Sequence, residues 1–324
     1  MDSSPRSILR CRWRVDVLAS QPPAGHRVTA RLGRVVPESI GDLVPGVATF
    51  DFHVTSECSQ ECPYCWGPQD IGEVDTDTAL AIVAKIAASG ARRIVFTGGD
   101  PLKRADIGEL IHSAKRHGLE VAVSTTGDEL TAAFLDRHGA DIDLVSLPLD
   151  GATEEVSSRT KKEGHFTAVM AALDLLAVHP DIDVKVATPV TRFNIDDIPN
   201  IVTLLEERAR RSSNRLFYNV FQAFPRSMDP DVAWDQLIVT AAEFAALQDR
   251  VGGTRLRINW LSHETLDRLY VMVFPDGRLT IPSGSAFAFY GDFLEVEGLD
   301  DVLARAEFDV AKHRRHAEGW HREG

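Results

Sequence analysis

The stretch 57-ECSQECPYCW-66 decides how the rest of the sequence is interpreted, because it places three of the four cysteines within eight residues. The spacing Cys58-x3-Cys62-x2-Cys65 allows a disulfide-stapled loop, a structural zinc site or a redox cluster. Four cysteines make a poor disulfide framework for 324 residues, and a reducing compartment would keep them as thiols. The three cysteines are therefore predicted to bind metal.

The number of cysteines separates the two metal chemistries. A structural zinc ion takes four ligands, usually from two closely spaced cysteine pairs. The chain has no second pair, so zinc would need a distant fourth ligand such as His53. Three thiolates without a fourth suit a cubane iron-sulfur cluster in which one iron stays open to another molecule.

Composition sets the class of protein. Hydrophobic residues make up 44% of the chain and charged residues 26%, which fits one large α/β domain or two smaller ones. The net charge of −13 argues against binding to a nucleic acid polymer, which depends on clustered Lys and Arg. No apolar run approaches the ~20 residues of a membrane span, and the start lacks the hydrophobic region of a signal peptide. We expect a cytoplasmic protein without a membrane partner.

Strand-like and helix-like segments alternate six times between Val47 and about Phe224, beginning with 47-VATFDFHV-54 and 92-RRIVFTGG-99. This alternation predicts a parallel sheet with crossover helices, an α/β fold of the partial (β/α)6 barrel type. Functional residues in such a fold gather at the C-terminal ends of the strands. The notable residues follow the strands in this way: Cys58, Gly98 and Gly99, Ser124 to Gly127, Asp150, Thr188 to Asn194, and Gln222 to Arg226.

Three regions are expected along the chain. Residues 1–46 form an N-terminal extension with a small hairpin, in which Cys11 is a free or buried thiol rather than a ligand. Residues 47–226 form the core barrel. Residues 227–324 form a C-terminal extension that closes the barrel, with a hairpin turn at 275-PDG-277 and a terminal helix. The basic run 312-KHRRH-316 is interpreted as the solvent-facing cationic end of that helix.

The cysteine stretch resembles the CxxxCxΦC motif of the radical S-adenosylmethionine (radical SAM) superfamily, including the aromatic Tyr64 before the last cysteine. The stretch 97-TGGDP-101 follows the next strand, as the GGEP-type motif of that family does, with Asp100 in place of the usual Glu. The stretch 146-SLPLDG-151, with Arg159 beyond it, and 188-TPVTRFN-194 resemble the fourth and fifth strand segments. The resemblance covers about residues 47–225.

The resemblance implies one 4Fe-4S cluster, held by Cys58, Cys62 and Cys65, and one S-adenosylmethionine whose methionine part chelates the open iron. Reduction would cleave this cofactor to a 5′-deoxyadenosyl radical that abstracts hydrogen from a substrate. The protein then supplies binding, orientation and exclusion of water. An electron donor such as flavodoxin or ferredoxin is expected as a partner.

The resemblance also implies a set of cofactor-binding residues, several of which have a simpler structural alternative. Hydroxyl groups at strand ends also cap helices, and a cation after the fourth strand can simply face solvent. The predicted residues are Gly98, Gly99 and Asp100 near the methionine ammonium, Ser124 and Thr126 near the ribose or carboxylate, Arg159 on the carboxylate, Asn194 near the ribose or as a helix N-cap, Tyr64 over the cluster or adenine, and backbone at 222–224 near the adenine edge.

The substrate is suggested partly by a missing cysteine. Many relatives have a cysteine after the proline of the C-terminal hairpin, which binds an auxiliary cluster, whereas this chain has Ser283 and no cysteine beyond Cys65. Relatives with one cluster often act on nucleotides, nucleosides or sugars, so we expect a small polar substrate in specialised metabolite biosynthesis. Candidate substrate contacts are Arg192, Arg226, Arg257, His53 and Asn259, and candidate hydrogen donors are Tyr218, Tyr290 and Cys11.

Two other function classes stay open. The chain could be a radical enzyme that acts on a protein partner, as a peptide maturase or a glycyl-radical activase. It could also be a metal-binding module that has lost catalysis. His53, inside the first strand, has a further alternative as a core histidine with satisfied hydrogen bonds.

Overall fold

The computed structural model describes residues 47–225 and 232–318, which build one ten-stranded sheet in the order β10-β9-β8-β1-β2-β3-β4-β5-β6-β7. Strands β8 and β1 to β7 run parallel, and β9 and β10 continue the sheet antiparallel beyond β8. The strands are β1 Thr49–Thr55, β2 Arg93–Gly98, β3 Glu120–Ser124, β4 Leu144–Pro148, β5 Asp183–Val190, β6 Leu216–Gln222, β7 Arg257–Leu261, β8 Val271–Val273, β9 Arg278–Ser283 and β10 Ala286–Asp292.

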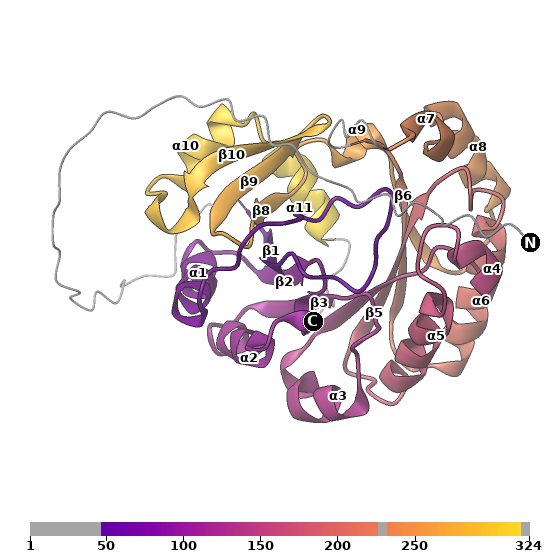
Figure 1. Cartoon of the computed structure of the whole chain (residues 1–324), viewed down its shortest axis with the longest axis horizontal. Coiled ribbons are helices and arrows are strands. Elements are labelled where there is room, and N and C mark those ends of the chain that lie inside the picture. Colours follow the sequence, from indigo (N-terminus) through magenta and orange to yellow (C-terminus); the bar gives the residue numbers. More distant parts are fainter. Residues whose placement is uncertain (1–46, 226–231, 319–324) are drawn as a thin grey trace, which may run out of the picture.

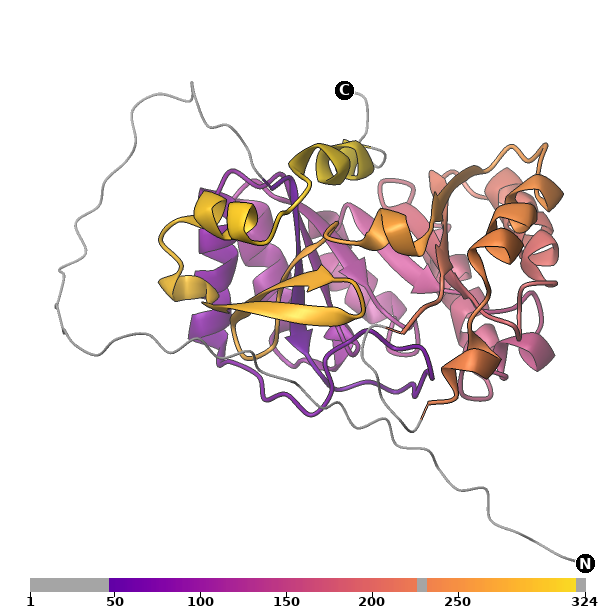
Figure 2. The ribbon, with the colours of Figure 1, turned by 90° about the horizontal axis from the view of Figure 1, so that it is seen from above.

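Helices cover the outer face of the curved sheet (Figure 1). The α-helices are α1 Thr76–Ala88, α2 Ile107–Arg116, α3 Ala132–His138, α4 Glu154–Ser157, α5 His165–Leu176, α6 Ile198–Arg211, α7 Trp234–Leu237, α8 Ala241–Arg250, α9 His263–Leu266, α10 Leu299–Arg305 and α11 Val310–Glu318. Short 3-10 turns are η1 Pro101–Lys103, η2 Gly139–Asp141 and η3 Phe293–Glu295. The last helix, α11, lies at the opposite end of the strands from the cysteine loop (Figure 2).

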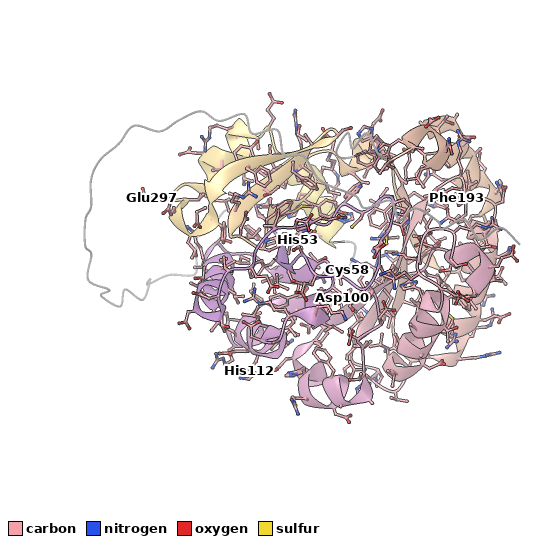
Figure 3. All side chains as sticks on the ribbon, viewed as in Figure 1. His53, Cys58, Asp100, His112, Phe193 and Glu297 are labelled. Carbon is pink, nitrogen blue, oxygen red and sulfur yellow. The ribbon has the colours of Figure 1, made fainter. Side chains whose placement is uncertain are left out.

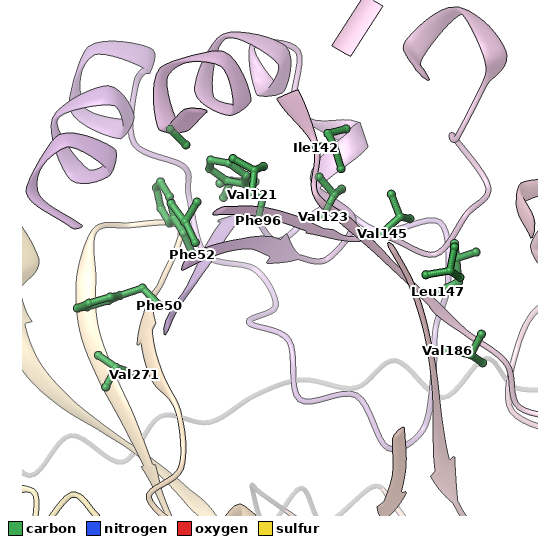
Figure 4. Close-up of a cluster of buried hydrophobic side chains, with 14 of the residues drawn as sticks. Phe50, Phe52, Phe96, Val121, Val123, Ile142, Val145, Leu147, Val186 and Val271 are labelled. Carbon is green, nitrogen blue, oxygen red and sulfur yellow. The ribbon is translucent and has the colours of Figure 1, made fainter. Parts of the chain in front are cut away.

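The main core lies between the sheet and these helices. On β1, Phe50, Phe52 and Val54 have no exposed surface and face the helix side, where Phe52 packs 6.4 Å from the ring of Phe96 (Figure 4). Apolar side chains of α1 meet them, because its residues recur at helical spacing. This layer fixes β1, and therefore fixes where the loop after β1 starts.

The predicted α/β fold is confirmed: the sheet is mainly parallel, and it does not close into a complete barrel. It is larger than six βα units, because β7 and β8 also run parallel to the others and extend the sheet on both sides. The hairpin at Pro275–Gly277 is present as β8 and β9, with Met272 opposite Thr280. The hairpin expected within residues 1–46 lies outside the described residues, and the domain bounds stay predictions.

Within the described ranges, no helix combines the length and the apolar character needed to cross a bilayer.

Candidate active site

A cavity of about 360 Å³ runs through the inside of the curved sheet. It is bounded by the cysteine loop at the C-terminal ends of the strands and by α11 at their N-terminal ends. Inward side chains from seven strands line its wall, since alternate residues of a strand point to the same face. His53 and Cys58, both lining residues, are labelled near the middle of Figure 3, with Asp100 just below them.

The cysteines lie on the loop between β1 and α1, which contains no regular helix or strand from residue 56 to 75. Side chains at the end of β1 hold this loop: Thr55 donates to Glu73 (2.8 Å), and the Ser56 hydroxyl donates to the Ile71 carbonyl (2.8 Å). The loop ends at Asp75, whose carboxylate caps α1 by accepting from the Thr78 amide (2.8 Å). These anchors bring all three cysteines to the cavity, with Cys58 the most exposed.

The surroundings of the sulfur atoms fit an iron-sulfur cluster. Backbone amides of Gln60 and Gly67 donate to the sulfurs of Cys58 (3.4 Å) and Cys65 (3.3 Å), and the Lys161 ammonium lies 3.0 Å from the sulfur of Cys62. Such donors stabilise thiolates and tune the potential of bound clusters. In the described part of the chain, no three His, Cys, Asp or Glu side chains are arranged as a site for one metal ion.

Electrostatics at the cysteines point the same way. Burial raises the pKa of Cys65 to about 12, with the neighbouring Cys62 adding to the effect, and burial also raises the pKa of Cys58. Thiols whose pKa is raised in this way become thiolate ligands when positive charge is brought next to them. The irons of a cluster supply that charge.

A buried polar network supports the cysteine loop from β4. Tyr64 is buried, and its hydroxyl donates to the Asp150 carboxylate, which also accepts from the Thr160 hydroxyl (2.5 Å). The Lys161 ammonium lies 5.5 Å from the centre of the Tyr64 ring. Burial lowers the pKa of Lys161, but the charges of Cys62 and Asp150 outweigh burial and raise it overall, so the side chain is a cation. Tyr64 thus lines the cavity with its hydroxyl fixed behind it.

Gly98 and Gly99 are required by the close approach of β2 to the start of the cysteine loop. A Cβ on Gly98 would lie 2.2 Å from the Thr55 carbonyl oxygen, and a Cβ on Gly99 would lie 2.1 Å from that of Glu57. Backbone hydrogen bonds close this contact, from the Gly99 amide to Thr55 (2.8 Å) and from the Asp100 amide to Glu57 (2.7 Å). Both glycines also line the cavity, so their backbone is open to a ligand.

Asp100 is fully buried and does not line the cavity. Its carboxylate accepts from the Leu102 amide (3.0 Å), from the Thr125 hydroxyl (2.8 Å) and from both the amide (3.2 Å) and the hydroxyl (2.5 Å) of Thr126. The carboxylate therefore clamps the end of β3 against the end of β2. This arrangement positions Ser124 and Thr126, which line the cavity beside Gly98 and Gly99.

Besides Asp100, two predicted cofactor residues lie away from the cavity lining. Arg159 is exposed and is held by the Phe193 carbonyl (3.2 Å) and by Glu155 (3.3 Å). Asn194 is buried and closes the turn after β5, where its amide group donates to the carbonyls of Asp150 and Pro189 (3.0 Å each). Asn194 is not the cap of α6, because that position belongs to Asp197.

The structure brings other residues to the cavity that the sequence interpretation did not select. Lys161 lies two residues beyond Arg159, and the turn after α4 directs it inward. Asp51 and Lys185 line the middle of the barrel from β1 and β5. Asp51 and Lys185 have a signal in the sequence, since each is a charged residue within a buried strand. The alternation of side chains along a strand shows that such a residue points inward only once the register of the strand is known.

The basic run at residues 312–316 is also placed differently from the prediction. His313 is buried, and its ring accepts from the amides of Ala48 (3.0 Å) and Thr49 (3.2 Å) and donates to the Leu269 carbonyl (2.8 Å). His313 and His316 line the floor of the cavity. The solvent-facing interpretation is therefore wrong for these two histidines, because α11 packs across the starts of β1 and β8.

The remaining substrate candidates are scattered. Arg192 pairs with Glu243 on the surface (3.1 Å), Arg257 is exposed on β7 and Asn259 donates to Asn219 (3.0 Å). Tyr218 is buried and donates to Thr188 (3.0 Å), and Tyr290 lies on β10 away from the cavity. Arg226 and Cys11 lie outside the described residues. Of the candidates in the described ranges, His53 lines the cavity.

Comparison with known proteins places part of the chain in a family. Residues 52–205 match the family model described as the radical SAM superfamily. This segment is a radical SAM domain. Members of this superfamily are enzymes that use a 4Fe-4S cluster and S-adenosylmethionine, and the donor set of Cys58, Cys62 and Cys65 fits that cluster. The predicted cofactors and enzyme class are thereby confirmed.

Two curated radical SAM relatives are named S-adenosylmethionine-dependent nucleotide dehydratases. The protein of Lacinutrix mariniflava is 27% identical over 290 residues, which is 84% of this chain and 58% of that protein. The protein of Flammeovirga pacifica is 25% identical over 268 residues, which is 79% of this chain and 88% of that protein. The chain thus spans little more than half of the first relative and most of the second.

Among solved radical SAM structures, Streptococcus suis SuiB bound to its precursor peptide SuiA superimposes with a TM-score of 0.63 at 11% identity. The match covers 84% of this chain and 67% of SuiB. At this identity the likeness concerns the fold.

Proposed function

We propose that this radical SAM enzyme acts on a small polar molecule, a nucleotide, nucleoside or sugar, in specialised metabolite biosynthesis. The observation that carries the proposal is the cavity of about 360 Å³, which runs from the three cysteines into the barrel interior and has charged side chains on its wall. The named activity of the two dehydratase relatives supports the same substrate class. A mostly apolar cavity with a few charged groups on its wall suits a small molecule whose polar groups those charges orient.

When bound, the cluster and S-adenosylmethionine supply the radical that removes hydrogen from the substrate. Cys58, Cys62 and Cys65 hold the cluster at the cavity mouth in this proposal. The exposed backbone of Gly98 and Gly99, with the Ser124 and Thr126 side chains, lines the wall next to it and orients the methionine and ribose parts.

The cationic contact to the cofactor carboxylate is assigned to Lys161 rather than to Arg159. Lys161 lines the cavity 3.0 Å from the sulfur of Cys62, whereas Arg159 is held on the surface by Glu155 and the Phe193 carbonyl. A cation at this position of the cavity would hold the carboxylate of S-adenosylmethionine when the cofactor is bound. Asp100 and Asn194 act as positioning residues, through the end of β3 and the turn after β5.

Electron transfer is proposed to occur on the Cys58 side of the loop. Cys58 is the most exposed of the three cysteines, so a flavodoxin or ferredoxin docked there would approach the cluster over a short distance. Tyr64, Trp66 and Gln60 close the rest of the mouth and exclude water from the reacting groups.

The substrate class is tested by substrate-dependent release of 5′-deoxyadenosine from the reconstituted protein under anaerobic conditions. We expect ribonucleoside triphosphates, nucleosides or nucleotide sugars to stimulate release, and short peptides to leave it at the background rate. Stimulation by a peptide alone, as a maturase or activase would show, contradicts the proposed substrate class. A Lys161→Met variant that keeps its iron but binds S-adenosylmethionine as tightly as the wild type contradicts the assigned carboxylate contact.

A further inference from the structure

The two faces of β1 are chemically different, although both are covered by protein. Phe50, Phe52 and Val54 are completely buried in the hydrophobic core, part of which is drawn in Figure 4. Thr49, Asp51 and His53 alternate with them and line the cavity. A central strand of a parallel sheet is usually apolar on both faces, so three successive polar residues on the inward face call for a physical reason.

These three side chains present polar atoms that the protein leaves without hydrogen bonds. The Thr49 hydroxyl and the Nδ1 atom of His53 are buried and have no hydrogen-bond partner among the described residues. His53 is only 6% exposed. Asp51 makes no hydrogen bond or ion pair with the described residues, and the charge that acts on it is that of Lys185 on β5.

Buried polar atoms without partners are costly and uncommon in folded proteins, and they call for a ligand, a water or a catalytic role. Here they occur as a row on one strand, and the row faces a cavity rather than a packed core. The ring of His53 is held by Phe274, whose centre lies 5.2 Å away, so its orientation is fixed before anything binds. The row therefore has the character of a preformed recognition surface.

The chemistry of the row defines what it can bind. Burial lowers the pKa of His53 to about 3, so its imidazole is neutral and offers one donor and one acceptor. Burial raises the pKa of Asp51 to about 6 against the opposing effect of Lys185, so its carboxylate is mostly ionised at neutral pH and accepts from hydroxyl groups. Burial lowers the pKa of Lys185 to about 8, which leaves this side chain mostly cationic.

We propose that the inward face of β1, formed by Thr49, Asp51 and His53, is a binding subsite for the hydroxyl groups of the substrate, and that Lys185 receives the anionic end of the same molecule. Such a ligand has several hydroxyl groups and a phosphate on one molecule. Nucleotides and sugar phosphates share this chemistry. This subsite rests on the proposed small-molecule function and specifies the residues that would select the substrate.

The test is anaerobic titration calorimetry of the full-length reconstituted protein with three probes: cytidine triphosphate, ribose 5-phosphate and inorganic phosphate. We expect cytidine triphosphate or ribose 5-phosphate to bind, with affinity at least tenfold lower in Asp51→Asn and in His53→Phe. His53→Gln, which keeps a donor and an acceptor, should recover part of the loss. Binding of cytidine triphosphate alone identifies a nucleotide, and binding of ribose 5-phosphate as well identifies the sugar phosphate unit.

A stability readout separates a ligand-binding role from a structural one. Thr49→Val removes an unpartnered hydroxyl at constant shape, so its urea midpoint should rise while its affinity for the probe falls. Thr188→Val is the control for a buried hydroxyl that has a partner: Thr188 donates to the Leu149 carbonyl (2.5 Å), so its midpoint should fall.

The subsite is overturned if none of the probes binds, if the variants bind like the wild type, or if Thr49→Val is less stable than the wild type. Release of 5′-deoxyadenosine is measured on the same samples. Normal release without probe binding refutes this subsite alone, whereas absent release from a wild type with full iron content refutes the proposed function.

Discussion

Replacing Asp100 by Asn should loosen the end of β3 without removing a contact to the cofactor. The carboxylate of Asp100 is buried and accepts from four donors: the Leu102 and Thr126 amides and the Thr125 and Thr126 hydroxyls. The Asn side chain has the same shape but offers one oxygen instead of two. If this oxygen still accepts a hydrogen bond from the Leu102 amide, the new NH2 group points at the Thr126 amide. Two hydrogen-bond donors then face each other, and the Thr126 amide has no acceptor.

The size of the effect follows from these contacts. A buried amide left without an acceptor costs about 1–3 kcal/mol, and hydrogen bonds to a charged group are stronger than neutral ones by about 1 kcal/mol. The hydroxyls can rotate and accept from the new NH2 group, so the total comes to about 3 kcal/mol. Since 1.4 kcal/mol corresponds to a factor of ten, exchange of the Thr126 amide through local opening should accelerate about a hundredfold.

The assay is hydrogen-deuterium exchange of peptides that cover residues 120–130, together with calorimetric binding of S-adenosylmethionine. We expect faster exchange in this segment. The affinity for S-adenosylmethionine should fall by less than tenfold, because only the displacement of Ser124 and Thr126 weakens binding. Asp276→Asn, in the distant β8–β9 turn, serves as the control and should leave this segment unchanged. Wild-type exchange in Asp100→Asn, combined with a more than tenfold loss of affinity, would show that the carboxylate contacts the cofactor directly and would refute the clamp.

Three further predictions concern the cavity and its walls. Gly99→Ala places a Cβ 2.1 Å from the Glu57 carbonyl oxygen, so the cysteine loop must move and iron uptake should fall by more than half. Gly72→Ala, on the same loop, is the control: no atom lies within 4 Å of its added Cβ, so this variant should take up the full amount of iron. Lys161→Met should keep its iron but lose at least tenfold in affinity for S-adenosylmethionine, with Lys161→Arg intermediate; equal affinity in all three proteins would remove Lys161 from the cofactor site. The folded-state pKa of His53 lies below its unfolded value of about 6.5, so its stabilising contribution is present above pH 6.5 and is lost as the pH falls towards 3. At pH 5 the loss is about 2 kcal/mol, and urea unfolding of His53→Phe should lack this part of the acid dependence, while an identical pH profile in both proteins would show that the ring is not desolvated.

The sequence predicted the parts of the site that depend on local order along the chain. Strand and helix alternation located the strand ends, and the cysteine spacing predicted a metal-binding loop, which the structure has after β1. Gly98 and Gly99 could be selected because a glycine pair after a strand indicates close backbone approach, which the structure shows against Thr55 and Glu57.

The sequence could not predict which way individual side chains point after the strand ends. Arg159 and Lys161 are two residues apart in a short turn, and the packing of that turn against the cysteine loop decides which cation enters the cavity. Asp100 was expected to face the cofactor, but its burial against Thr125 and Thr126 depends on contact between β2 and β3. The positions of His313 and His316 depend on α11 reaching β1 across 265 residues of sequence.

The most direct test of the account is anaerobic reconstitution with iron and sulfide, followed by iron analysis and measurement of 5′-deoxyadenosine from S-adenosylmethionine after dithionite reduction. The wild type should hold about four irons per chain, as one cubane cluster requires, and should release 5′-deoxyadenosine. Cys58→Ala, Cys62→Ala and Cys65→Ala should lose both properties, and Cys11→Ala should keep both. A wild type that holds one zinc ion and leaves S-adenosylmethionine intact would contradict the account.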